Sequence, residues 1–254
     1  MPSPASSSLD HRPWPCPRAP WAMAMKWHDL LFMHWPVPVE VLRPLVPAGL
    51  EIDTFDGVAW LGVVPFRMSG IRARGTPAMP WVSAFAELNV RTYVTAGGRA
   101  GVWFFSLDAA SRLAVRVARA TFRLPYFDAQ MHIAGTTGDA AGAVTYSSVR
   151  THRNAPPAEF AATYTPTGEV YRAQPGDLDH WLTERYCLYA ASPAGRLSRG
   201  EIHHSPWPLQ PAACDTTVNT MTHQLGITLP PAPPLLHFAK QLDVVAWLPT
   251  SRGC

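Results

Sequence analysis

The chain has 254 residues, of which 47% are hydrophobic and only 15% are charged. This composition supplies ample material for a core and excludes a disordered, strongly solvated chain. The formal net charge of +3 is too small for a dedicated nucleic-acid-binding protein, and no apolar stretch approaches the roughly 18 residues of a transmembrane helix, so neither nucleic acid nor membrane is expected as a partner.

The first 22 residues are rich in proline, serine, arginine and tryptophan and lack the apolar segment of a secretory signal. They are therefore predicted to form a disordered N-terminal extension, residues 1–22, ahead of a single domain over residues 23–250. The four cysteines show no C-x-x-C spacing, which favours a reducing compartment over a disulfide framework. Together these features predict a cytoplasmic protein.

The first elements of the domain are predicted from apolar runs and turn residues. Residues 27–35 are nearly all apolar, which is typical of a buried strand, and residues 39–45 suit a short helix. Residues 51–66 predict a hairpin with Asp56-Gly57 as its turn. Residues 68–82 are rich in Gly, Pro, Arg and Met without periodicity, which predicts a surface loop suited to act as a lid.

Residues 85–107 are the most informative stretch, because two runs rich in β-branched and aromatic residues flank a Gly97-Gly98 turn and predict a hairpin. Alternation along the first strand separates a polar from an apolar face. The polar face carries Glu87, Asn89, Arg91 and Tyr93, and the other carries Leu88, Val90, Thr92 and Val94. The polar face either meets water or lines a polar cavity, and the residues alone leave both open.

A helix is predicted between this hairpin and Pro125, with Asp108 or Ser111 as its cap. Its apolar stripe at i, i+4 spacing comprises Leu113, Val117 and the row Ala114, Ala118, Phe122. The opposite stripe carries Arg112, Arg116, Arg119 and Arg123. Such a stripe is compatible with phosphate or nucleic acid, but a solvated helix face is its commoner explanation.

The rest of the chain continues as short strands and turns. Strands are predicted over residues 129–133, 143–150, 159–164, 185–189, 199–204 and 235–248, and short helices near residues 178–182 and 219–225. Roughly ten to twelve strands with a few short helices and no βαβ rhythm indicate an antiparallel barrel or a folded double sheet. The predicted fold class is therefore a β-rich α+β domain.

The sequence gives little support for a metal site, a nucleotide site or a serine hydrolase. His203 and His204 are adjacent on a predicted strand, so their side chains point to opposite faces and cannot chelate one ion together. A site built from His34, His237 and one member of that pair would need tertiary contact. No G-x-S-x-G, G-x-G-x-x-G or P-loop motif is present. No metal and no cofactor are predicted.

Five charged residues within otherwise apolar strands would be costly to bury unless they are paired: Glu87, Arg91, Glu184, Arg185 and Glu201. One interpretation is a set of structural ion pairs that brace the strands. The other is a polar cavity that holds a carboxylate or carbonyl compound and moves a proton.

Seven segments carry a resemblance to a known family: WHDLLFMHWPVP (27–38), GVVPF (62–66), ELNVRTYV (87–94), GVWFFSLDA (101–109), LTERYCLY (182–189), RGEIHHSPWPLQPA (199–212) and LLHFAKQLDVVAW (235–247). On these the chain resembles the YqjF-like family of uncharacterised proteins (domain of unknown function 2071). That family is similar to acetoacetate decarboxylase-like proteins, and the resemblance implies their fold, a closed antiparallel cone-like β-barrel with a few short helices around a substrate cavity.

The same resemblance compares individual positions with those of the decarboxylases. His34 falls where they have the arginine that holds the substrate carboxylate, and Glu87 falls where they have a catalytic-site glutamate. Tyr126 stands in place of the Schiff-base lysine, and Phe127 in place of its pKa-lowering neighbour. Neither Tyr nor Phe forms an imine, so the resemblance implies a cavity without lysine-dependent decarboxylation.

These observations predict a small-molecule site. Glu87, His34 and Tyr126 are the candidate catalytic residues. Arg91, Arg185, His203 and His204 are the candidate substrate-binding residues, and which of the two histidines faces the cavity is left open. The predicted ligand is a small oxygenated organic compound, and the predicted chemistry is proton transfer, as in isomerisation, dehydration or cyclisation. The alternatives are a non-catalytic carrier or sensor and a purely structural domain. A homo-oligomer is left open.

Overall fold

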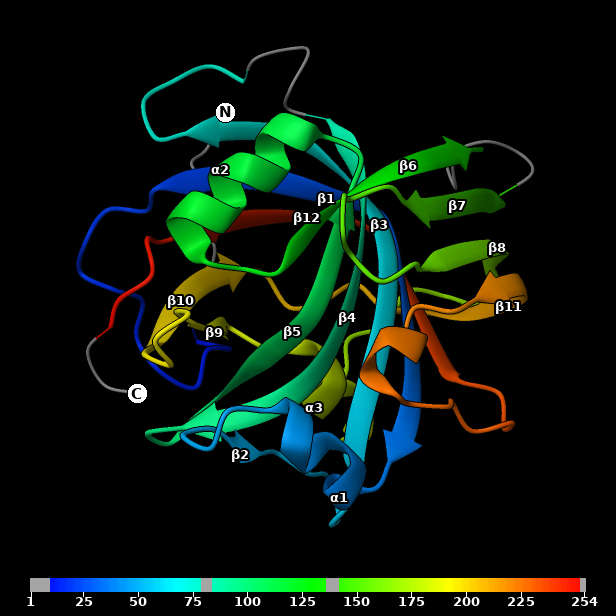
Figure 1. Ribbon diagram of the computed structural model, residues 1–254, viewed down its shortest axis with the longest axis horizontal. Coiled ribbons are helices and arrows are strands. Elements are labelled where there is room, and N and C mark those ends of the chain that lie inside the picture. The colour runs from blue at the N-terminus through cyan, green and yellow to red at the C-terminus, as the bar shows by residue number, and fades with distance from the viewer. Residues whose placement is uncertain (1–9, 79–83, 136–141, 252–254) are drawn as a thin grey trace.

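The computed structural model of the protein describes residues 10–78, 84–135 and 142–251. Over these residues the chain is mainly β-structure with a few short helices (Figure 1). The strands are β1 (Met23–Val37), β2 (Glu51–Ile52), β3 (Ala59–Ala73), β4 (Phe85–Ala96), β5 (Arg99–Ala109), β6 (Tyr126–Ala134), β7 (Val144–Arg150), β8 (Glu159–Pro166), β9 (Cys187–Ala191), β10 (Leu197–His204), β11 (Gln210–Asn219) and β12 (Leu235–Ala246). The helices are α1 (Val39–Leu42), α2 (Arg112–Phe122) and α3 (Leu178–Thr183), with 3-10 turns η2 (Arg43–Leu45) and η3 (His223–Leu225).

The strands form one hydrogen-bonded sheet in the order β10-β9-β5-β6-β7-β8-β11-β12-β1-β3-β4-β2. Two further pairings, β10–β12 and β4–β5, join strands that are not neighbours in this order. As a result, a set of seven strands exists in which each strand pairs with two others of the set: β1, β3, β4, β5, β9, β10 and β12. We call this set the seven-strand ring.

Two of the pairings are parallel, which corrects the expectation of an antiparallel sheet. β5 runs parallel to β6 and to β9. The first of these pairs is possible because α2 carries the chain back across the sheet between β5 and β6, and parallel neighbours need such a crossover. The helix was predicted from its own period, but the direction of the strand that follows it is a tertiary property.

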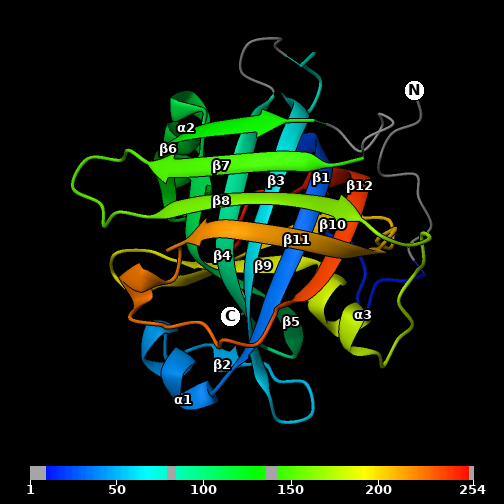
Figure 2. The ribbon, with the colours of Figure 1, turned by 90° about the vertical axis from the view of Figure 1, so that its right-hand side faces the viewer.

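Four strands outside the ring form a second layer. In Figure 2, β6, β7, β8 and β11 lie side by side and cross in front of β4, β3 and β1 at a steep angle. The largest hydrophobic cluster fills the space between the layers, with Leu31, Val63, Leu88 and Val90 on one side and Tyr146, Phe160 and Tyr164 on the other. One face of β1, β3 and β4 is therefore buried by this layer, and the opposite face is turned towards the interior of the ring.

β11 was not predicted from the sequence. It pairs with β8 from Ala212 to Asn219, yet most of its residues are partly or fully exposed. Because the strand buries little apolar surface, its sequence lacks the alternation that identifies a half-buried strand.

The predicted central hairpin is confirmed as β4 and β5. Gly97 and Gly98 make its turn with φ values of 56° and 71°, which glycine adopts without strain. The pairing shifts between Val90↔Ser106 and Arg91↔Phe104, so one extra residue, Phe105, bulges from β5. Val102 and Phe104 lie before the bulge and Leu107 lies after it. Because of the extra residue, all three side chains face the interior of the ring.

The segment before β1 corrects the prediction of a disordered extension. Residues 10–22 pack against the domain: Arg12 is 8% exposed, and the Trp247 Nε1 donates to the carbonyl oxygen of Ala19 over 2.7 Å. Proline and arginine in this segment suggested disorder, but the arginine finds a buried carboxylate as partner. Residues 1–9 lie outside the described residues.

Three other predicted boundaries change. β2 pairs with β4 and not with β3, although the Asp56-Gly57 turn does form. The predicted loop over residues 68–82 starts later because β3 continues to Ala73, and residues 79–83 lie outside the described part of the chain. Ser111, not Asp108, caps α2 by accepting from the backbone N–H of Ala114. Among the described residues, no helix is long and apolar enough to cross a membrane.

Candidate functional site

The interior of the seven-strand ring encloses a cavity of about 200 Å³. Every strand of the ring contributes to its wall, together with α2 and the segments that follow α2, α3, β10 and β12. Most of the lining side chains are apolar. The polar and ionisable ones are Glu87, Asn89, Arg91, Tyr126, Thr183, Arg185, Glu201 and His204.

β4 supplies the polar row of this wall. Phe85, Glu87, Asn89 and Arg91 all line the cavity, whereas Leu88 and Val90 between them pack into the core below the second layer. The two-residue period of a strand produces this separation, because successive side chains point to opposite faces. The predicted two faces of this strand are thus both buried, and the polar one meets a cavity and not bulk water.

Glu87 is the acidic group of this row and is 2% exposed. Its Oε2 accepts a hydrogen bond from the Tyr126 hydroxyl over 2.9 Å. Burial raises the pKa of Glu87 to about 8, the Tyr126 hydrogen bond partly opposes the rise, and nearby Asp108 adds to it. At neutral pH Glu87 therefore holds a proton beside the cavity that it can give up, which is the property of a general acid and base.

Arg91 lies on the same face as Glu87 and has no acidic partner. Among the described residues, no carboxylate forms an ion pair with it. Its Nη2 lies 3.4 Å from the Tyr93 hydroxyl, its guanidinium lies over the Phe32 ring at 5.2 Å, and its buried Nε has no hydrogen-bond partner. The Arg91 guanidinium can therefore still donate hydrogen bonds to an anion.

Arg185 approaches the same place from the end of α3. Its Nη1 pairs with Asp53 over 2.5 Å and its Nε donates to the Trp181 carbonyl oxygen, but its buried Nη2 has no partner. Its guanidinium lies 4.9 Å from the centre of the Tyr93 ring, and that of Arg91 lies 5.7 Å from it. Burial lowers the pKa of Arg185, Asp53 opposes this, and Arg91 adds to it. Of the two guanidinium groups, only that of Arg185 pairs with a carboxylate, which is that of Asp53.

His34 does not line the cavity, which corrects its predicted place in the wall. It is fully buried behind Arg91 and Tyr93, and its Nε2 lies 2.6 Å from the Tyr93 hydroxyl. Burial, reinforced by the charge of Arg91, lowers the pKa of His34 well below its usual value. The Tyr93 oxygen also accepts from Arg91, so the phenol links the two side chains. His34 therefore supports Arg91 from behind.

The two adjacent histidines of β10 separate as strand alternation requires. His204 lines the cavity and stacks on Tyr186, with ring centres 4.7 Å apart. His203 is not in the cavity wall and stacks on His11 of the N-terminal segment instead. The sequence left open which of the two histidines faces the cavity, and in the structure it is His204. Burial lowers the pKa of both rings.

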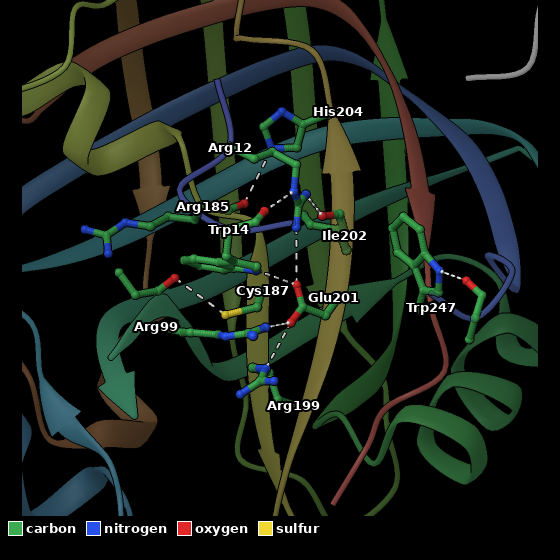
Figure 3. A network of polar contacts seen from close by, with 12 residues as sticks. Arg12, Trp14, Arg99, Arg185, Cys187, Arg199, Glu201, Ile202, His204 and Trp247 are labelled. Carbon is green, nitrogen blue, oxygen red and sulfur yellow. Dashed lines mark hydrogen bonds and ion pairs between the residues drawn. The ribbon is translucent and has the colours of Figure 1, made fainter. Parts of the chain in front are cut away.

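Glu201, also on β10, has a different environment. Figure 3 shows Arg12, Trp14, Arg99 and Arg199 converging on its carboxylate. The bonds measure 3.2 Å from Arg12, 2.8 Å from Trp14 Nε1, 2.6 Å from Arg99 and 3.1 Å from Arg199. We call these five residues the Glu201 cluster. All four of the other residues donate to Glu201, and Arg12 also donates to the carbonyl oxygen of Ile202, so the cluster joins the N-terminal segment and β5 to β10.

Several contributors to this region were missed from the sequence. Asn89 was placed on the polar face but not counted as a site residue, although it lines the cavity and its buried Oδ1 has no partner. Its position midway between Glu87 and Arg91 was a sufficient signal. Asp53 and Trp181, which hold Arg185, carried no such signal, because Asp53 lies 132 residues from Arg185 in the sequence.

Within the described residues, no three or more histidine, cysteine, aspartate or glutamate side chains are arranged to hold a metal ion. What the cavity offers is one protonated carboxyl group, one phenol bonded to it, and two guanidinium groups with unpaired donors in a largely apolar wall. This set can bind an anion and exchange a proton with it.

The sequence is similar to known proteins over most of its length. The model of the DUF2071 family, described as an uncharacterized conserved protein, matches residues 24–243. The uncharacterized protein YqjF of Bacillus subtilis (strain 168) is 49% identical over 227 residues, which cover 89% of this chain and 91% of that protein.

Solved structures with the same fold have much lower sequence identity. The enduracididine biosynthesis enzyme MppR, complexed with the condensation product of pyruvate and imidazole 4-carboxaldehyde, superposes with a TM-score of 0.63 at 11% identity, over 91% of this chain and 89% of that one. An acetoacetate decarboxylase-like enzyme from Sphingomonas wittichii RW1 gives a TM-score of 0.61 at 14% identity, over 91% and 93%. At these identities the likeness extends to the fold alone.

Proposed function

Since the chain belongs to the DUF2071 family and its fold is that of the acetoacetate decarboxylase-like neighbours, we propose that it binds a small oxygenated organic anion in its cavity and catalyses proton transfer on it. The observation that carries this proposal is Glu87, a fully buried carboxyl group with a pKa of about 8 in the wall of the cavity. Isomerisation, dehydration and cyclisation of a carbonyl compound all need such a group.

We further infer that the seven-strand ring is a closed barrel. Each of its strands pairs with two others of the set, which leaves no edge within it. The cavity wall takes residues from all seven strands. Both observations support a barrel interior as the place of the ligand, with the second layer packed outside it.

In the proposed reaction, ionised Glu87 takes a proton from the carbon next to the carbonyl group of the ligand. The electron pair of that C–H bond moves onto the carbonyl oxygen and gives an enolate. Protonated Glu87 then returns the proton to the same or a neighbouring carbon. Tyr126 is a positioning residue, because its hydroxyl is already bonded to Glu87. Arg91, the cation on the same face of β4, stabilises the negative charge.

Schiff-base decarboxylation is not part of this proposal. The chain has two lysines, Lys26 and Lys240, and neither lines the cavity. Lys26 is 42% exposed and pairs with Asp243 on the outer face of β1 and β12. Amine catalysis needs a lysine desolvated beside the substrate, and this chemistry therefore has no amine to use.

The proposal is tested by following deuterium exchange at the carbon next to the carbonyl group of 2-oxopentanoate and 4-oxopentanoate by proton NMR. We expect the protein to accelerate exchange, with a rate that rises up to about pH 8 as Glu87 ionises. Glu87→Gln should lower the rate at least about 100-fold. Glu40→Gln, which changes an exposed glutamate of α1, should leave it unchanged.

Two other outcomes would change the proposal. Saturable binding of these acids without accelerated exchange would favour a non-catalytic carrier or sensor that uses the same cavity. Exchange that proceeds equally well in Glu87→Gln would remove Glu87 from the mechanism.

A further inference from the structure

The cavity has a polar end and an apolar end, and β4 connects them. Along its inward face the order is Phe85, Glu87, Asn89, Arg91. At about 3.3 Å per residue, roughly 20 Å separate the first and last of these Cα atoms. Arg91 marks the polar end, where the unpaired donors of Arg91 and Arg185 lie around Tyr93.

The other end, around Phe85, is largely apolar. Phe85 pairs with Met68 on β3, and Met68 pairs with Trp27 on β1, all three of which line the cavity. Ile71 and Met25 extend this wall, and α2 covers it with Ala114, Val117, Ala118 and Phe122. Of the ionisable lining residues, His204 lies beside this wall, with its ring centre 6.5 Å from that of Trp27.

The apolar end is also where the cavity meets solvent. Val117 lines the cavity and is nevertheless 52% exposed. Leu113, one turn earlier on α2, is 53% exposed. The apolar stripe predicted for this helix is thus only partly covered, and the cavity opens beside it. A ligand that enters here passes the apolar wall first and reaches the guanidinium groups last.

The charge at the polar end selects the kind of anion. Arg91 and Arg185 carry two positive charges and Asp53 carries one negative charge, which leaves one positive charge to balance. The single negative charge of a monoanion neutralises this excess, whereas a dianion would leave a net negative charge. A protonated amine would be repelled by this positive charge. A polyhydroxylated ligand would place hydroxyl groups against the apolar wall and would lose the free energy gained by burying apolar surface.

We propose that the ligand is a monocarboxylic acid with a hydrocarbon chain or ring, bound with its carboxylate at Arg91 and Arg185 and its hydrocarbon part under α2. This inference rests on the proposed function and extends it to a class of substrate. Glu87, between the two ends of the cavity, then faces the carbon atoms between the carboxylate and the hydrocarbon part. The apolar wall and not the carboxylate distinguishes one acid from another.

The test is calorimetric titration with butanoate, hexanoate, octanoate and decanoate, and with the primary alcohol and primary amine of each length. We expect the affinity for the acids to rise about fourfold with each added methylene, which corresponds to about 0.8 kcal/mol, until the chain extends past α2. The alcohols and amines should bind at least about tenfold more weakly. In Arg91→Met the acids should lose this advantage over the alcohols.

Two matched variants of α2 test the apolar end. Val117→Asn introduces an amide into the wall, whereas Leu113→Asn makes a comparable change at an equally exposed position outside the lining. Val117→Asn should weaken the binding of octanoate and decanoate several-fold and leave the binding of butanoate unchanged. Leu113→Asn should bind all four acids as the unaltered protein does. Because both positions are exposed, neither change endangers folding.

The contrary outcomes separate this inference from the function on which it rests. Acids that bind with an affinity independent of chain length would overturn the hydrocarbon part and leave the proposed function intact. Alcohols that bind as tightly as acids would overturn the role of the guanidinium pair. If none of the acids binds and the oxopentanoates show neither binding nor exchange, both proposals are wrong.

Discussion

The Glu201 cluster and the polar row of β4 place charged side chains in similarly buried surroundings but treat them differently. Glu201 accepts from three guanidinium groups and an indole N–H (Figure 3). Glu87 has a phenol as its partner, and no carboxylate in the described part of the chain pairs with Arg91. The charged residues of the Glu201 cluster pair with one another, whereas the polar row of β4 leaves hydrogen-bond donors and one proton available at the cavity.

The comparison separates two interpretations that the sequence could not. Burying a charge costs free energy unless it is paired, so structural charges acquire partners during folding. Glu184 follows this rule, because it accepts from Tyr186 and from the backbone N–H of Trp207. The unpaired atoms of Asn89, Arg91 and Arg185 do not follow it, and their cost to stability is one reason to assign them to a ligand.

The largest expected effect comes from breaking the Glu201 cluster. In Glu201→Gln the three arginines lose their shared negative charge, and the Arg12 side chain is only 1% exposed. We expect the free energy of unfolding to fall by about 3–5 kcal/mol, the cost of leaving buried charges uncompensated. Urea unfolding measures this. A loss below about 1 kcal/mol would show that the cluster does not hold the segment in place.

A smaller effect should follow from removing one neutral donor of that cluster. Trp14→Phe keeps an aromatic ring between Arg12 and Arg99 but deletes the N–H that donates to Glu201 over 2.8 Å. We expect a loss of about 1.5 kcal/mol, typical of a hydrogen bond to a charged group. The unfolding midpoint in urea is the measurement, and Trp21→Phe, whose indole N–H has no such acceptor in the cluster, is the control.

For the polar row, the expected effect is a dependence of stability on pH. The folded protein keeps the Glu87 proton up to about pH 8, whereas the unfolded chain releases it near pH 4.5. The contribution of Glu87 to stability is therefore fully present below pH 4.5 and is lost as the pH rises towards 8, at up to about 1.4 kcal/mol per unit.

Glu87→Gln should remove this slope, because an amide does not titrate in that range. Denaturant unfolding of both proteins between pH 5 and pH 9 gives the difference directly. Parallel curves for the two proteins would mean that Glu87 titrates at an ordinary pKa and would weaken its assignment as the acid and base.

The smallest change in stability is expected for Arg91→Met. The substitution removes a guanidinium that no carboxylate compensates and keeps an apolar side chain over Phe32. We expect a change within about 1 kcal/mol, in either direction. Arg185→Met, which would leave Asp53 without its partner, should cost more. If Arg91→Met proved the more destabilising of the two, Arg91 would belong with the structural charges.

Much of the fold could be predicted from local patterns. The β4–β5 hairpin follows from two β-branched runs and the Gly97-Gly98 turn, and α2 follows from its period and from Pro125. The two faces of β4 follow from alternation alone. What local patterns did not predict are elements that depend on distant partners: β11, whose residues bury little surface, and residues 10–22, which contact β10, the end of β12 and Trp247 after it.

The sequence by itself therefore determined the family, the β-rich class and the grouping of Glu87 and Arg91 on one face of a strand, because each depends on motifs or on a spacing of two residues along one strand. Only the tertiary structure decided which charges are paired. Asp53 pairs with Arg185, Arg12 pairs with Glu201, and His34 is hydrogen-bonded to Tyr93 outside the cavity. Each of these contacts joins segments that are far apart in the chain. The electrostatic state of a buried group depends on the whole set of neighbours around it, and no local pattern specifies that set.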